Sequence, residues 1–195
     1  SHSAVSVSSG DDATRASRLL LVLQETNGAD GSVLSNRFVS AGDTFRAGDQ
    51  GTVRIGSAAG TELVVEPGGI LRVVAADATK RFVLLRGAVH TRVAKLLPGE
   101  RFIIETSHTK VEVHGTQFRV SLLDAAPGCG GMVTKVSVSE GVVSVDSAGQ
   151  EERLFPGDDW LSKCAPSPTR EQDQPWSRRK LARRRAHSKA RLVVV

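Results

Sequence analysis

Apolar and polar residues alternate along residues 101–122, and the phase of the alternation changes at Gly115. Val111 and Val113 stand on odd positions before the glycine. The apolar residues after it stand on even positions: Phe118, Val120 and Leu122. Successive side chains of a strand point to opposite faces, so one unbroken strand would bury only one of these sets. The pattern therefore predicts two core-facing strand segments that meet in a bulge or tight corner at Gly115.

A nine-residue period precedes this stretch. Glycines mark the period, and Ala78 fills its one gap: Gly42, Gly51, Gly60, Gly69 and Gly87. A short run of strand-forming residues follows each of these positions. Such spacing predicts an all-β single domain of many short antiparallel strands with glycine turns, arranged as a sandwich, a barrel or a short β-solenoid. The period could also arise by coincidence in a glycine-rich chain, and that alternative leaves the all-β class unchanged.

Alternation returns over residues 133–145, and Gly141 shifts its phase as Gly115 does. Residues 17–24 are apolar enough for a first strand, and residues 154–161 indicate a last turn and strand. Residues 1–16 are small and polar, which predicts a flexible lead-in. We therefore place the domain at residues 17–164. A tail follows at residues 165–195. It is rich in Pro and Ser at first and basic after that, and we expect it to be helical or disordered.

Composition changes this picture in one respect, the charge. Hydrophobic residues make up 39% and aromatic residues only 4%, so the predicted core is aliphatic. The formal charge of +5 belongs to the tail, because residues 169–195 hold nine basic and two acidic residues. Residues 1–168 hold 17 basic and 19 acidic residues and are close to neutral. No apolar run approaches the roughly 20 residues that a membrane helix needs.

Four features, in order, carry a family resemblance: F-I-I-E-T at 102–106, V-E-V-H-G-T-Q-F-R-V at 111–120, V-S-V-S-E-G-V-V-S-V at 136–145, and F-P-G-D at 155–158. With the glycine-led repeats before them, they resemble the FecR domain family over about residues 40–163. The resemblance makes a small set of residues the signature of the fold: Gly115, Thr116, Phe118 and Gly141. We read these residues as architecture.

The resemblance implies an all-β extracytoplasmic domain in a bacterium. Its best-known members are periplasmic parts of membrane-anchored regulators that relay the occupancy of an outer-membrane transporter to a sigma factor. This sequence shows no helical anti-sigma segment, no membrane span and no transporter-docking domain after residue 165. We therefore expect the fold and the periplasmic compartment to carry over, but not the specific role in iron transport.

The two cysteines are Cys129, in a glycine-rich loop, and Cys164, after the last predicted strand. With the extracytoplasmic compartment that the resemblance implies, an even cysteine count favours a disulfide between them. Two free thiols in a cytosolic protein are the alternative. The histidines His90, His108 and His114 form no recognisable ligand spacing, so we predict no metal site. The sequence also lacks the signatures of common enzyme classes, and we assign no catalytic residue and no cofactor.

The basic tail is the strongest charge feature. Its run of cations provides candidate contacts for an anionic partner: Arg178, Arg179, Lys180, Arg183, Arg184 and Arg185. Anionic lipid fits such a run, whereas nucleic acid is disfavoured because only Trp176 offers a stacking side chain. A solvated tail or linker is the alternative.

The predicted function is a non-catalytic signalling or interaction domain with a protein partner in the envelope. An envelope-structural or glycan-binding module is the alternative. Strand addition at a sheet edge is the expected mode of binding, because edge strands offer unpaired backbone groups.

Overall fold

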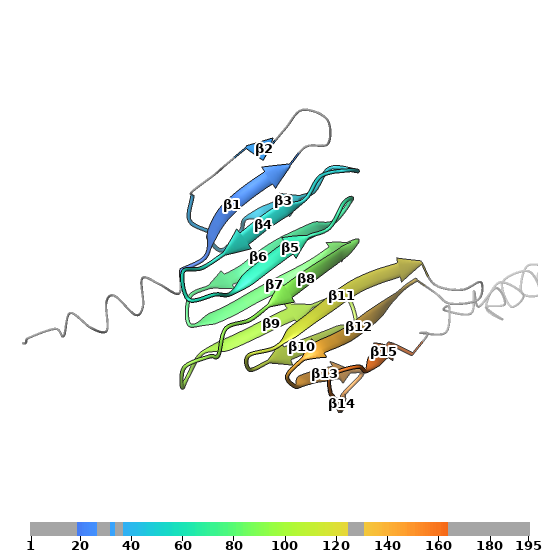
Figure 1. The fold of residues 1–195 in the computed structure, drawn as a ribbon. Coiled ribbons are helices and arrows are strands. Elements are labelled where there is room, and N and C mark those ends of the chain that lie inside the picture. The colour runs from blue at the N-terminus through green and yellow to red at the C-terminus, as the bar shows by residue number, and fades with distance from the viewer. Residues whose placement is uncertain (1–18, 27–31, 34–36, 125–130, 164–195) are drawn as a thin grey trace, which may run out of the picture.

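The computed structural model describes residues 19–26, 32–33, 37–124 and 131–163, which form two β-sheets and no helix (Figure 1). One sheet has eight strands: β1 (Leu21–Thr26), β2 (Ser32–Val33), β4 (Val53–Gly56), β5 (Glu62–Val65), β8 (Ala88–Arg92), β11 (Gln117–Asp124), β12 (Met132–Glu140) and β15 (Asp159–Leu161). The other has seven: β3 (Thr44–Arg46), β6 (Ile70–Ala76), β7 (Thr79–Arg86), β9 (Arg101–Glu105), β10 (Thr109–Val113), β13 (Val143–Ser147) and β14 (Gln150–Leu154).

The two sheets stack as an open sandwich, which confirms the all-β class. Strand order is β2-β1-β4-β5-β8-β11-β12-β15 in one sheet and β3-β6-β7-β9-β10-β13-β14 in the other. The chain therefore advances from one edge to the other as a solenoid does, while it crosses repeatedly between the sheets. All strand pairs of the described chain are antiparallel except β7–β9, which is parallel. The chain crosses to the other sheet through β8 between these two strands, as a parallel pairing requires a crossover.

The nine-residue period corresponds to strands. All six runs that follow its glycines and Ala78 are strands of the structure, from β3 to β8. Gly42, Gly60 and Gly87 have φ values of +95°, +92° and +73°, a backbone conformation that glycine adopts at little cost. The period is therefore the length of one short strand and its turn.

Both phase changes mark a change of sheet. Gly115 lies between β10 of the seven-stranded sheet and β11 of the eight-stranded sheet, with a φ of +95°. Gly141 lies between β12 and β13, which also belong to different sheets, with a φ of +80°. Of the two alternatives predicted for Gly115, a bulge within one strand or a tight corner between two, the structure shows the corner. The phase must change because the core lies on opposite faces of the two sheets.

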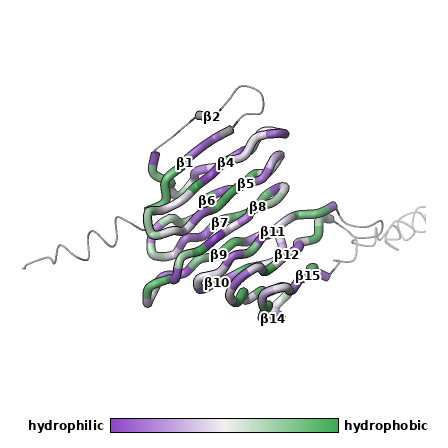
Figure 2. The backbone as a smooth tube through the Cα atoms, viewed as in Figure 1, coloured by the Kyte–Doolittle hydropathy of each residue, from purple (hydrophilic) through white to green (hydrophobic). Residues whose placement is uncertain are grey.

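One hydrophobic core fills the space between the sheets, and hydrophobic and hydrophilic residues alternate along the strands (Figure 2). Val111, Val113 and Phe118 have no exposed surface, as the alternation predicts. The core is largely aliphatic, and its aromatic contact joins Phe82 and Phe102 at 5.4 Å between ring centroids. The described residues include no helix with the length and hydropathy of a membrane span.

Candidate interaction surfaces

The two corner glycines lie against each other. A Cβ atom added to Gly141 would lie 2.6 Å from Cγ2 of Thr116 and 2.8 Å from the carbonyl oxygen of Gly115. A Cβ atom added to Gly115 would lie 3.2 Å from Cα of Lys95. The two phase changes are therefore one structural unit, which we call the glycine corner: Gly115, Thr116 and Gly141. This packing is consistent with the architectural role predicted for these residues.

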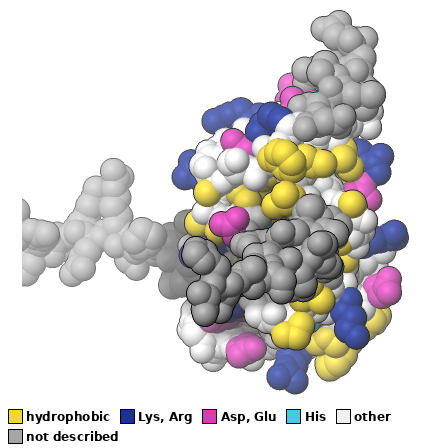
Figure 3. All heavy atoms as spheres, turned by 90° about the vertical axis from the view of Figure 1, so that its left-hand side faces the viewer, with side chains coloured by type: hydrophobic (Ala, Val, Ile, Leu, Met, Phe, Trp, Pro, Cys, Tyr) yellow, Lys and Arg dark blue, Asp and Glu magenta, His cyan; other side chains and the backbone are white. Residues whose placement is uncertain are grey.

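A shallow groove of about 420 Å³ borders the glycine corner at one end of the sandwich. Its walls include Gly60, Arg92, Thr116 and Glu140. Figure 3 looks at an end of the sandwich, where exposed hydrophobic side chains lie among basic and acidic ones. The Thr116 hydroxyl is buried and has no hydrogen-bond partner among the described residues. Because Thr116 belongs to the glycine corner, we assign this hydroxyl to the fold and not to a binding site.

Three turns of the same build each lead into a strand of the sandwich: Ser40–Asp43, Leu97–Glu100 and Phe155–Asp158. In each, the fourth residue donates its backbone N–H to the first carbonyl, and its carboxylate accepts the first residue's N–H at 2.7–3.0 Å. The hydrogen bond from the Ser40 backbone N–H, and after it the one from the Arg37 guanidinium, lowers the pKa of Asp43. The sequence indicates all three as turns: L-P-G-E at 97–100 and F-P-G-D at 155–158 through their Pro-Gly pairs, and the first through Gly42, which begins the nine-residue period. Their common hydrogen bonding appears only in the structure.

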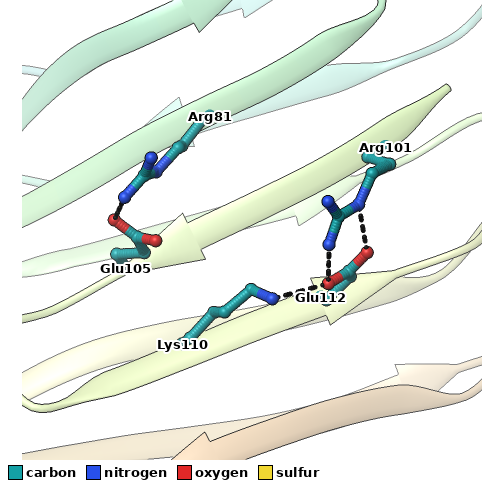
Figure 4. A network of polar contacts seen from close by, with 5 residues as sticks. All are labelled: Arg81, Arg101, Glu105, Lys110 and Glu112. Atoms are coloured by element: carbon teal, nitrogen blue, oxygen red, sulfur yellow. Dashed lines mark hydrogen bonds and ion pairs between the residues drawn. The ribbon is translucent and has the colours of Figure 1, made fainter.

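A network of five charged side chains lies on the outer face of the seven-stranded sheet (Figure 4). Arg101 of β9 donates two hydrogen bonds, of 2.7 and 2.8 Å, to the Glu112 carboxylate of β10. Lys110 Nζ lies 2.9 Å from the same carboxylate, and Arg81 pairs with Glu105 at 2.8 Å. The hydrogen bond from Arg101 is the main reason why the pKa of Glu112 falls to about 2.

Acid should therefore weaken the fold through Glu112. Its pKa is lowered in the folded state, so its stabilisation is present above the usual value of 4.5 and is lost as pH falls towards about 2. The pair is partly solvated, so we expect Glu112→Gln to cost roughly 1 kcal/mol at neutral pH. Urea unfolding at pH 7, 4 and 2.5 measures this. The difference from the parent should shrink at pH 2.5, whereas Glu140→Gln should match the parent throughout; a constant difference would contradict the assignment.

A second ion pair crosses the outer face of the eight-stranded sheet. Arg119 of β11 donates hydrogen bonds of 2.5 and 2.7 Å to the Glu66 carboxylate, just after β5. Strand β8 lies between β11 and β5, so the pair spans a strand. The contact lowers the pKa of Glu66 and raises that of Arg119. It links segments 53 residues apart in the sequence.

The three histidines are separated. His90 Nε2 lies 3.4 Å from Gln117 on β11, and His114 is exposed beside the glycine corner. His108 Nε2 lies 3.0 Å from Ser162 Oγ, a geometry that a nucleophile and its base could share. That serine is 5% exposed, and its Oγ also accepts the backbone N–H of Thr134 at 2.9 Å. We interpret this contact as a structural link that holds Ser162, just after β15, against β12.

No group of three or more metal-ligating side chains occurs in the part of the chain that the structure describes. Several predicted features lie outside that part. These are the flexible lead-in, both cysteines (Cys129 and Cys164) and the basic run from Arg178 to Arg185. The proposed disulfide and the anionic contacts therefore stay predictions.

The described geometry defines an open, two-sheet β domain in which Gly115, Thr116 and Gly141 form a corner and ion pairs lie on the outer faces of both sheets. The family model described as FecR protein matches residues 43–144, half of the chain, and the chain belongs to the FecR family. Comparison with curated proteins finds no match.

Two solved structures are similar to part of the chain. Both are crystal structures of a candidate anti-sigma factor from Parabacteroides distasonis ATCC 8503, at 1.65 and 2.50 Å resolution. Each is 20% identical, with a TM-score of 0.49. The match covers 64% of this chain and 61% of theirs.

Proposed function

We propose that this chain is a non-catalytic signalling regulator domain that works by binding another protein in the bacterial cell envelope. The observation that carries the proposal is the FecR family match over residues 43–144. The tight packing at Gly115, Thr116 and Gly141 supports a structural role for the predicted signature residues, with the domain as a scaffold. Binding then falls to its edges, loops and outer faces.

The surface supports protein recognition. Each sheet is open, and its terminal strands leave one side of the backbone unpaired by the other described strands. An edge of this kind can accept an extended segment of a partner, with backbone hydrogen bonds for affinity and side chains for specificity. The groove beside the glycine corner is shallow, and its walls are mainly small side chains and backbone.

Regulation of a sigma factor is the finer proposal. Family membership and the description of the two similar structures as candidate anti-sigma factors favour it. The same family membership supports a periplasmic location, as part of a membrane-anchored protein. An envelope-structural or glycan-binding module is the competing function.

Deletion of the encoding gene tests the proposal. A regulator should alter the transcript levels of a small set of genes, and the parent gene should restore them. A Gly141→Val variant, whose corner cannot form, should not. Unchanged transcripts together with sedimentation of the purified chain on peptidoglycan would replace the regulator by the glycan-binding module.

The proposed periplasmic location predicts a disulfide between Cys129 and Cys164. In the chain-entropy model, such a cross-link stabilises a domain by roughly 3–4 kcal/mol. Intact mass after unfolding and alkylation measures the thiols. Protein isolated from an oxidising compartment should take up no alkyl group without reductant and two with it. Uptake of two groups without reductant would disprove the cross-link.

The basic residues from Arg178 to Arg185 are proposed contacts for an anionic surface. Sedimentation with vesicles that contain phosphatidylserine, at low and high salt, would test this role. Binding that persists after all six cations are replaced by glutamine would exclude it.

A further inference from the structure

Strand β14 is the longest open edge among the described strands. It ends the seven-stranded sheet and pairs with β13 alone. It has five residues, whereas the other strands that end a sheet have two (β2) or three (β3 and β15). The first four residues of β14 are exposed. The described residues that contact its side chains from beyond β13 are Trp160, which donates to Glu152 at 2.9 Å, and Lys163, which donates to Gln150 at 3.4 Å. Neither contact uses the β14 backbone, so an added strand could pair with it.

The register of this edge places two carboxylates opposite each other. Asp146 of β13 faces Glu151 of β14, and both lie on the outer side of the sheet. Like charges directly opposite across a strand pair are unfavourable. Lys110 faces Asp146 from β10, but its Nζ pairs with Glu112 at 2.9 Å. No ion pair is formed by Asp146 or Glu151 within the described residues.

A depression of about 120 Å³ lies beside these carboxylates. Its walls are Lys110, Glu112, Ser144, Asp146 and Glu151. A strand added to β14 would place a side chain opposite Glu151, next to this depression. Two residues along, it would place another opposite Arg153, which faces the same side of the sheet as Ser144. The open edge, the depression and the unpaired charge therefore meet at one place.

We propose that β14 binds an extended segment of the partner protein that carries a lysine or arginine opposite Glu151. This inference rests on the proposed function and specifies the chemistry of the partner. The cation would form an attractive cross-strand pair with Glu151 and so offset the repulsion between Glu151 and Asp146, while the edge backbone supplies the hydrogen bonds. Opposite Arg153 the same segment would carry a neutral or acidic residue. Edge charges can instead serve only to prevent strand pairing, and that role predicts no preference for a cation.

Two synthetic peptides test this inference on the full chain. Both are acetylated, amidated octapeptides of alternating threonine and valine, and they differ in one central residue, lysine or glutamate. Hydrogen exchange should show protection of the β14 amides by the lysine peptide. The lysine peptide should bind about three- to tenfold more tightly than the glutamate peptide, the range expected for exchanging one cross-strand attraction for repulsion.

Matched variants decide the mechanism. Asp146→Asn with Glu151→Gln should abolish the preference for lysine and leave exchange elsewhere unchanged, whereas Glu140→Gln on β12 should keep it. Equal binding of both peptides, or protection at another edge, would overturn the inference. A third outcome would also overturn it: β14 amides that are protected in the chain alone and lose this protection when the six tail cations are neutralised. The segment bound to β14 would then be the tail of this chain and not a partner. The gene-deletion result is independent of all these outcomes, so a failure here would leave the regulatory proposal standing.

Discussion

Gly141→Ala is expected to lower the free energy of unfolding by about 2–5 kcal/mol. The residue has a φ of +80°, which costs an L-residue about 1–2 kcal/mol. The added methyl group would also lie 2.8 Å from the Gly115 carbonyl oxygen and 3.1 Å from Cα of Thr116, both of them backbone atoms. Backbone cannot rotate away as a side chain can, and overpacking of this kind costs about 1–3 kcal/mol more. Urea or thermal unfolding measures the loss.

Gly99→Ala is the matched control for Gly141→Ala. Its φ is +85°, but an added Cβ would meet no atom within 4 Å. It should therefore show the conformational cost alone, about 1–2 kcal/mol. The difference between the two variants isolates the contact between the corner glycines. If they lose equal stability, Gly115 and Gly141 do not form one unit.

Gly115→Val extends the test to the other side of the corner. Its φ of +95° and the 3.2 Å approach to Cα of Lys95 should make a β-branched residue strongly destabilising. His114→Ala, at the exposed neighbouring residue, should leave the melting temperature nearly unchanged. A valine variant that melts like the parent would contradict the phase-change argument itself.

The elements of the fold could be predicted from sequence because each depends on local chemistry. The period-2 alternation gives the buried face of a strand, and glycine gives the position where the backbone turns. Val111, Val113 and Phe118 are buried for this reason, and the strands after the nine-residue glycines begin where expected. The phase changes at Gly115 and Gly141 also mark the places where the chain passes from one sheet to the other. This could be recognised only after the structure showed two sheets that share one core.

Strand partners could not be predicted, because alternation specifies a face and not a neighbour. The parallel pairing of β7 with β9, the contact between the two corner glycines and the pair of Glu66 with Arg119 all depend on register between distant segments. The opposition of Asp146 and Glu151 depends on the β13–β14 register in the same way. The candidate binding edge therefore emerges from the structure, although the sequence indicated strand addition as a mode of recognition.

Phe118→Ala is expected to cost about 3–5 kcal/mol, as typical of a large aromatic residue removed from a core. The ring has no exposed surface, and its residue lies between Thr91 of β8 and Val138 of β12 in the register of the eight-stranded sheet. These neighbours belong to strands paired on both sides, so they cannot move inward to fill the space. The loss would remove a large part of the 5–15 kcal/mol that stabilises a typical domain.

Phe155→Ala provides the control for the same chemical change. Phe155 is 55% exposed in the turn before β15, and the turn uses its backbone rather than its ring. We expect its unfolding free energy to stay within about 0.5 kcal/mol of the parent, as at most surface positions. Urea unfolding of the two variants and the parent measures both effects. Similar losses for Phe118→Ala and Phe155→Ala would mean that Phe118 does not anchor the core, and its place in the FecR signature would then need a reason other than packing.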